Sequence, residues 1–103
     1  MSSRRVELGN ILKSILGNSN TYFQPSENIK LVYPCAVYDF DGVNQRSAND
    51  SVYKFDRRYS VTFISKDPDN EYYESMISAL KYVRFDRRFK ADNLYHDVFT
   101  VYY

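Results

Sequence analysis

The chain has 103 residues, of which 44% are hydrophobic, and its formal net charge is +1. This length and composition exclude a disordered chain and predict one compact domain over residues 1–103. The near-neutral charge argues against a dedicated nucleic-acid binder, and the single cysteine, Cys35, excludes an internal disulfide. No apolar run approaches the ~20 residues that span a bilayer, and residues 1–10 lack the apolar core of a cleaved leader.

The first predicted element is a helix over residues 3–16. Apolar side chains recur there at the spacing of one helical face, and Gly17 followed by Asn18 tolerates the backbone that ends a helix. A polar connection over residues 17–28 is expected to lead from this helix to the first strand.

The next three segments predict a strand, a loop and a second strand. Residues 29–40 favour a strand that is interrupted at Pro34. Residues 41–50 are polar and begin with an Asp-Gly turn signal, so they predict a loop long enough to project from the body. Residues 52–66 alternate apolar and polar side chains and give the strongest strand pattern of the chain.

A second helix is expected after residue 66. Asp67 is suited to cap its start and Pro68 to occupy its first position. Tyr72 is expected to be an exposed aromatic. The side chains predicted to form the buried stripe of this helix are Tyr73, Met76, Ile77 and Leu80.

The last two predicted strands cover residues 82–89 and 95–103, and Asp92-Asn93 between them favours a hairpin turn. The element order is therefore α-β-β-α-β-β. Because each helix has a single apolar stripe, each should cover a sheet face. The expected fold class is α+β, with roughly four strands in an antiparallel or mixed sheet and two helices packed on it.

The tetrapeptide Phe-Asp-Arg-Arg occurs twice, at residues 55–58 and 85–88. The flanking sequences differ, so a structural repeat is the weaker interpretation, and two strands with the same packing pattern is the stronger one. Strand alternation places Phe, the first Arg and the following aromatic on one face, and Asp with the second Arg on the other. Such arginines can stack on aromatic rings or pair with carboxylates, within the sheet or across subunits.

Eleven tyrosines in the chain indicate that some aromatic side chains serve interfaces, where arginine is also enriched. The candidates for contacts with another subunit or a partner are charged or aromatic residues of the predicted strands and loop: Arg46, Asp56, Arg57, Arg58, Asp86, Arg87, Arg88, Tyr102 and Tyr103.

No catalytic, cofactor-binding or metal-binding residue is proposed from the sequence. His96 and Asp97 are adjacent in a predicted strand, so their side chains point to opposite faces and form no relay. Residues 39–44 resemble the start of a calcium loop but lack its later ligands. Cys35 is expected to be a buried small hydrophobe. We therefore expect a protein that is not an enzyme and needs no cofactor.

The segments YPCAVYDFDGVNQRSANDSVYKFDRRYSVTFISKDPDNEYYESM and VRFDRRFKADNLYHDVFTVYY resemble tail terminator proteins of tailed bacteriophages, also called tail completion or head-tail joining proteins. The shared pattern runs from YPC-x-VY through N-x-R-x-A-N-D and ISKDPD to a DNL-x-HD turn. It covers roughly residues 30–103.

The resemblance implies a compact α/β subunit that forms a homohexameric ring. That ring would cap the tail tube, end its polymerisation and join the tail to the connector proteins of the head, while DNA passes through the lumen without being read. It implies a virion location at the head-proximal end of the tail, reached from the host cytoplasm, and no membrane. The alternatives are a head-completion or stopper protein of the connector, or a small phage-encoded protein-binding module. An enzyme such as a metal-dependent nuclease is the least favoured reading.

Overall fold

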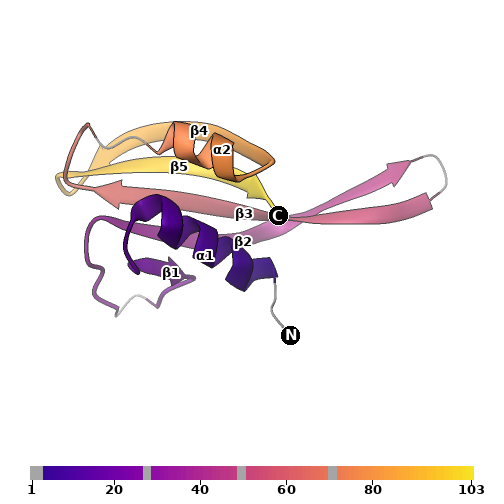
Figure 1. Cartoon of the computed structure of the whole chain (residues 1–103), viewed down its shortest axis with the longest axis horizontal. Coiled ribbons are helices and arrows are strands. Elements are labelled where there is room, and N and C mark those ends of the chain that lie inside the picture. Colours follow the sequence, from indigo (N-terminus) through magenta and orange to yellow (C-terminus); the bar gives the residue numbers. More distant parts are fainter. Residues whose placement is uncertain (1–3, 27–28, 49–50, 70–71) are drawn as a thin grey trace.

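The computed structural model describes residues 4–26, 29–48, 51–69 and 72–103, and for residues 43–48 and 51–56 it describes the backbone alone. Figure 1 shows its elements, which follow the order α1 (Arg4–Leu16), β1 (Thr21–Phe23), β2 (Cys35–Ala48), β3 (Ser51–Ser65), α2 (Tyr73–Ala79), β4 (Tyr82–Ala91) and β5 (Leu94–Tyr102).

The strands form one five-stranded sheet in the order β1-β2-β3-β5-β4. The pair β1–β2 is parallel, and the other three pairs are antiparallel. The predicted α+β class with two helices and a mixed sheet is confirmed, with one strand more than expected. The extra strand, β1, lies inside the connection predicted for residues 17–28. Three residues are too few to establish an alternating pattern in the sequence.

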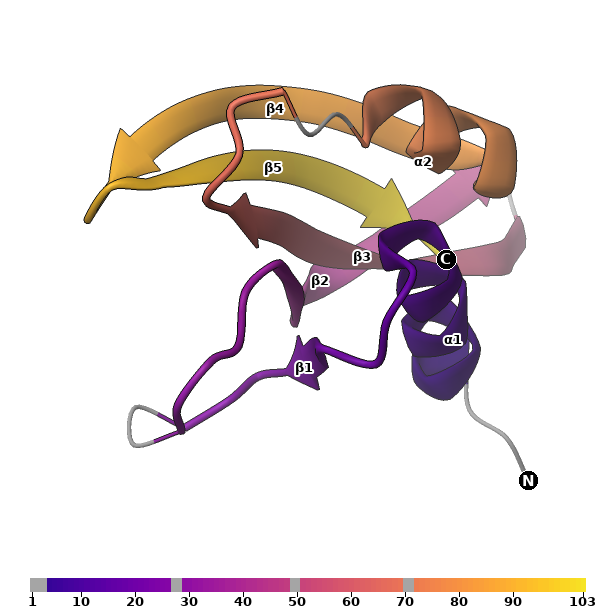
Figure 2. The same ribbon diagram turned by 60° about the vertical axis from the view of Figure 1, so that its left-hand side comes forward.

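Both helices lie on the same side of the sheet (Figures 1 and 2). Buried side chains of both helices and of the sheet form one core between them. On β3 the alternation is as predicted, with Tyr59, Val61 and Phe63 buried. The ring of Phe63 stacks on Tyr72 at a centroid distance of 4.3 Å and meets the edge of Phe99 at 5.8 Å. The buried side chains of the core are Leu8, Leu12, Ala36, Tyr38, Tyr59, Val61, Phe63, Tyr72, Met76, Leu80, Phe99 and Val101.

Helix α1 ends at Leu16, immediately before Gly17, as the sequence predicts. The predicted start of α2 is wrong. The Oδ1 of Asp67 accepts a hydrogen bond from the backbone N–H of Asp69, two residues on, at 2.9 Å. Asp67 therefore closes a local turn instead of capping a helix. The helix begins at Tyr73, and its N-cap residue makes no side-chain cap.

The buried stripe of α2 is displaced by one residue from the predicted one at its N-terminal end. Tyr72, Met76 and Leu80 are buried, whereas Tyr73 and Ile77 are 49% and 47% exposed. The expectation that Tyr72 is exposed is therefore wrong. Tyr72, Met76 and Leu80 recur at a spacing of four residues and face the core, so the side chains one position later, at 73 and 77, face outward.

The loop predicted for residues 41–50 is wrong for its described part, because residues 41–48 continue β2. They pair with β3 as far as Ala48 opposite Ser51. The predicted hairpin at Asp92-Asn93 is confirmed, since both residues have positive φ, at 54° and 62°. The Asp-Gly signal at residue 41 marks a β-bulge instead, with a register shift between Phe40 and Gly42.

The hairpin of β2 and β3 projects from the body, as expected of this segment (Figure 1), and the molecule measures 49 × 27 × 23 Å. Strand β5 pairs with β3 only from Arg58 onward. We call residues 41–48 and 51–57 the ribbon. Among the described residues, the strand partners in the ribbon are its own two strands.

Helix α1 approaches β2 closely at Gly9, which is buried. A Cβ at this position would lie 2.5 Å from the Tyr38 hydroxyl, which donates a hydrogen bond to the carbonyl oxygen of Arg5 at 3.2 Å. The absence of a side chain on residue 9 therefore permits the contact between the helix and the sheet.

We predict that Gly9→Ala destabilises the fold, although alanine favours a helix by about 1 kcal/mol. Overpacking against the Tyr38 hydroxyl should cost about 1–3 kcal/mol and outweigh that gain. In a Tyr38→Phe background the clashing oxygen is gone, so the same change should be neutral or stabilising. Urea unfolding of the four proteins measures this, and stabilisation by Gly9→Ala in the parent chain would contradict the packing argument.

Candidate interaction surfaces

The two Phe-Asp-Arg-Arg copies use their arginines in the same way. The first Arg of each copy lies over an aromatic ring, with the Arg57 Cζ 5.7 Å from the Phe40 centroid and the Arg87 Cζ 5.3 Å from the Phe89 centroid. The second Arg of each copy pairs with an aspartate on the neighbouring strand. The stacking and the charge pairing within the sheet are therefore both present.

The face predicted for part of the second copy is wrong because β4 has a bulge at Asp86. The register shifts between Phe85 and Arg87, so Phe85 lies opposite Phe99 and Arg88 opposite Asp97. The extra residue reverses the alternation after it. Phe85 and Arg88 consequently share the helix-covered side, while Arg87 lies on the other side.

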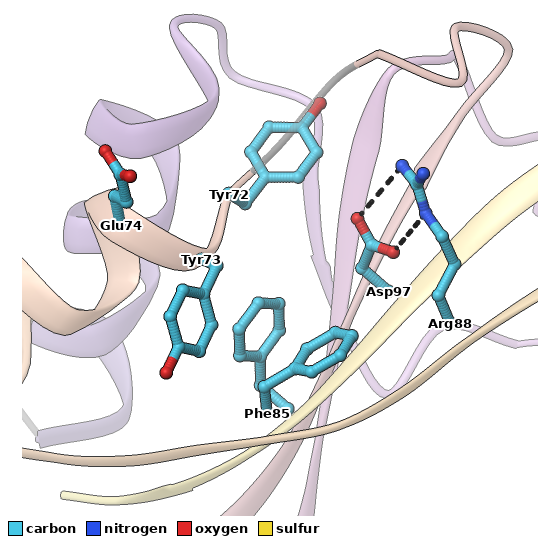
Figure 3. A pocket seen from close by; sticks show the side chains of 7 residues that line it. Tyr72, Tyr73, Glu74, Phe85, Arg88 and Asp97 are labelled. Carbon is cyan, nitrogen blue, oxygen red and sulfur yellow. Dashed lines mark hydrogen bonds and ion pairs between the residues drawn. The ribbon is translucent and has the colours of Figure 1, made fainter.

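Arg88 joins three parts of the chain. Its Nε donates to Asp97 Oδ1 at 2.7 Å, and its Nη1 donates to the carbonyl oxygen of Pro68 at 2.8 Å. Asp97 is buried, at 7% exposure. Figure 3 shows the guanidinium facing the carboxylate beside α2. Arg88 thus links the β3–α2 connection to the β4–β5 hairpin. It therefore has a structural role, apart from any contact that it makes with a partner.

Arg58 holds the base of the ribbon. Its Nε lies 3.1 Å from Asp41 Oδ2, and its Nη2 donates to the Asp41 carbonyl oxygen at 2.9 Å. Gly42, next in the bulge, has φ +148°, and a Cβ there would lie 2.9 Å from the Arg58 guanidinium. Glycine is therefore required where β2 leaves the sheet.

The C-terminal residues meet α1 beside this base. The Tyr103 N–H donates to the Arg57 carbonyl oxygen at 2.9 Å, and its hydroxyl donates to Glu7 at 3.2 Å. Arg4 lies over the Tyr103 ring at 4.8 Å. Burial and the Glu7 carboxylate raise the pKa of the Tyr103 hydroxyl. Tyr102 is half-buried.

Asp86 sits in a polar network. Thr100 Oγ1 donates to Asp86 Oδ2 at 2.6 Å, and Arg84 Nε donates to its Oδ1 at 2.9 Å. Burial alone would raise the pKa of Asp86, but these hydrogen bonds and the charges of Arg84 and Arg87 outweigh it and lower the pKa. The side chains of Arg46 and Asp56, also candidates from the sequence, lie outside the described part of the chain.

A hollow of about 260 Å³ opens between α2 and β4 (Figure 3). Four aromatic rings and three charged side chains line it: Tyr72, Tyr73, Phe85 and Phe99 with Glu74, Arg88 and Asp97. We call it the α2–β4 hollow. No pattern in the sequence pointed to it, because it depends on the late start of α2 and the bulge in β4.

The residues considered for catalysis are held in structural contacts. The His96 ring stacks on Phe89 at 4.6 Å, and its Nδ1 lies 3.2 Å from the Leu94 carbonyl oxygen. Cys35 is fully buried, and burial raises its pKa to about 11. Among the described residues, no three His, Cys, Asp or Glu side chains gather as a metal site would require.

In the described part of the chain, neither helix has the length and apolar character needed to cross a membrane. No protein-family model matches this chain, and no curated protein matches it. The function is therefore argued from the residues and their geometry.

Reversing the charge of Arg88 should destabilise the fold more than reversing that of Arg58. Arg88→Glu leaves the buried Asp97 facing a second carboxylate, which should cost roughly 2–4 kcal/mol. Arg58→Glu breaks a pair whose side chains are 41% and 53% exposed, and exposed pairs contribute about 0–1 kcal/mol. Urea unfolding compares the two variants, and equal losses would contradict the structural role of Arg88.

The stability of the protein should depend on Asp86 in acid. Because its pKa is lower folded than unfolded, its ionised form stabilises the fold above the ordinary Asp value of about 3.9. This contribution is lost as the pH falls through the lowered pKa. Asp86→Asn should therefore lose less stability than the parent chain below about pH 4. Unfolding midpoints from acid titration, with the exposed Asp69→Asn as control, measure the difference.

Proposed function

We propose that this chain is a structural subunit of a tailed-bacteriophage virion, which assembles into a ring that caps the tail tube and joins the tail to the head connector. The proposal rests on the resemblance of residues 30–103 to tail terminator proteins and on one structural observation, the ribbon. About half the length of β2 and β3 extends beyond the part of the sheet that β5 reaches.

A two-stranded ribbon alone is marginally stable in water, because it has little apolar surface to bury. Its outer edges also leave backbone N–H and C=O groups without strand partners among the described residues. Contact with another molecule would supply the missing burial. A projecting ribbon therefore favours an assembly role over a role carried out by the isolated subunit.

A ring also needs two different surfaces on each subunit, since head-to-tail contacts close a ring only when one patch meets another. The ribbon supplies one such surface, and the body supplies the other. A net charge of +1 is compatible with DNA passing through a lumen without being held by phosphate contacts.

The subunit would thus have itself, the tail-tube protein and the connector proteins as partners, at the head-proximal end of the tail. Its arginine and tyrosine side chains on β3, β4 and β5 are candidates for these contacts. No catalytic step and no cofactor enter the proposal.

Native mass spectrometry of the purified protein, alone and with tail tubes, tests this function. We expect a hexamer, or a monomer that becomes a six-copy cap on tubes. A variant with residues 43–56 replaced by Asn-Gly, a two-residue hairpin turn, should stay folded and lose the assembly.

Three outcomes would count against the proposal. A monomer that ignores tubes would favour a protein-binding module. Binding to portal or adaptor proteins instead of tubes would favour a connector stopper. If the shortened variant forms rings equally well, the ribbon is not needed for assembly.

A further inference from the structure

We propose that the α2–β4 hollow of one copy receives the ribbon of the next copy in the ring. This inference rests on the proposed function and names the contact between subunits that would close the ring. It assigns the hollow as the receiving surface and a second copy of this chain as its occupant.

The hollow has the character of an interface centre. Tyr73 and Phe85 are 49% and 40% exposed, and their rings meet edge to face at 5.9 Å. Ile77, at 47% exposure, lies one helical turn beyond Tyr73 on the same face of α2. Large apolar side chains grouped beside a hollow are typical of binding surfaces.

The floor of the hollow packs against the core. Phe85 also contacts the buried ring of Phe99 at 5.2 Å, and Tyr72 stacks on Phe63. The guanidinium of Arg88 is fixed by Asp97 and Pro68 at one end. A binding surface whose side chains are already ordered loses little conformational entropy when it is covered.

The ribbon of the same copy extends away from α2 and β4, so another copy must supply the occupant (Figures 1 and 2). The β3 arm, Ser51–Arg57, spans roughly 23 Å at about 3.3 Å per residue. The two shorter dimensions of the molecule are 27 and 23 Å. A ribbon of this length is long enough to lie across the body of a neighbouring subunit.

The charges of the two surfaces are complementary. The hollow has two carboxylates, on Glu74 and Asp97, against the single guanidinium of Arg88. The ribbon, residues 41–48 and 51–57, has three basic residues in its sequence against two aspartates, an excess of one positive charge. A cationic side chain entering the hollow would contact the exposed rings of Tyr73 and Phe85 and the carboxylate of Glu74.

Two other surfaces fit a ribbon less well. The helix-free face of the sheet presents the polar side chains of Ser60 and Thr62 in its centre, as a solvated face does. The outer edge of β4 has a bulge at Asp86 and a high density of charged side chains, features that prevent strand pairing.

Cysteine cross-linking between copies tests the contact. Ser47→Cys in the ribbon and Ile77→Cys beside the hollow are purified separately and mixed under conditions where rings or tube caps form. A short bifunctional maleimide should then join them into a covalent dimer. The native Cys35 is fully buried and should not react. Val32→Cys, at a residue that is 55% exposed in the β1–β2 connection, replaces Ile77→Cys as the matched control.

We expect the Ile77→Cys mixture to give at least tenfold more dimer than the Val32→Cys mixture. Rings that form normally but give no excess over the control would overturn the contact while leaving the proposed function standing. If neither rings nor caps form for any of these proteins or for the parent chain, the proposed function and the contact both fail.

A charged substitution at Ile77, beside the α2–β4 hollow, gives an independent test through its effect on assembly. Ile77→Lys should raise the concentration needed for half-assembly roughly tenfold or more, with an unchanged unfolding midpoint, because it places an ammonium group among apolar contacts and opposite a ribbon with an excess of positive charge. Val32→Lys is the matched control and should assemble as the parent does. Unimpaired assembly of the folded Ile77→Lys variant would overturn the proposal.

Discussion

Strand β3 pairs with β2 along nearly its whole length, but with β5 along only part of it. This unequal pairing divides the molecule into two regions. Where β3 lies between two strands, its alternating side chains meet both helices and form the core around Phe63. Where β5 stops, the same strand continues as half of a ribbon. The core therefore stabilises the point from which the ribbon projects.

The bulges at Asp41 and Asp86 determine how the charged residues of this framework are used. At Asp41 the bulge places the aspartate and its carbonyl oxygen against Arg58, at the base of the ribbon. At Asp86 the bulge moves Phe85 and Arg88 to the helix-covered side, beside α2. The same four-residue pattern thus supports the ribbon in one copy and one wall of the α2–β4 hollow in the other. A single extra residue in a strand is enough to separate the roles, because side chains alternate with a period of two.

The proposed ring contact relates these two regions to each other. The outer edges of the ribbon have no strand partner among the residues that the structure describes, and the hollow has exposed rings beside the buried ring of Phe99. In a head-to-tail arrangement each would cover the other, on every subunit in turn. Such a contact would also explain why Tyr73 and Ile77 face outward although each directly follows a buried residue, Tyr72 and Met76.

The sequence by itself determined the features that depend on neighbouring residues. The helical spacing of α1, the alternation of β3 and the Asp92-Asn93 turn all follow from local periodicity and backbone preference, and they sufficed for the α+β class. The use of the arginines for stacking and pairing was also predictable in kind, since alternation puts aromatic and acidic residues within reach.

Tertiary structure decided the rest. The strand β1 and the bulges at Asp41 and Asp86 depend on pairing with other strands, and β2 continues through a polar segment because residues 42–48 pair with residues 51–58. This pairing outweighs the turn preference of Asp41-Gly42, and the local turn at Asp67 replaces the predicted helix cap, so the ribbon and the hollow emerge only in the folded chain.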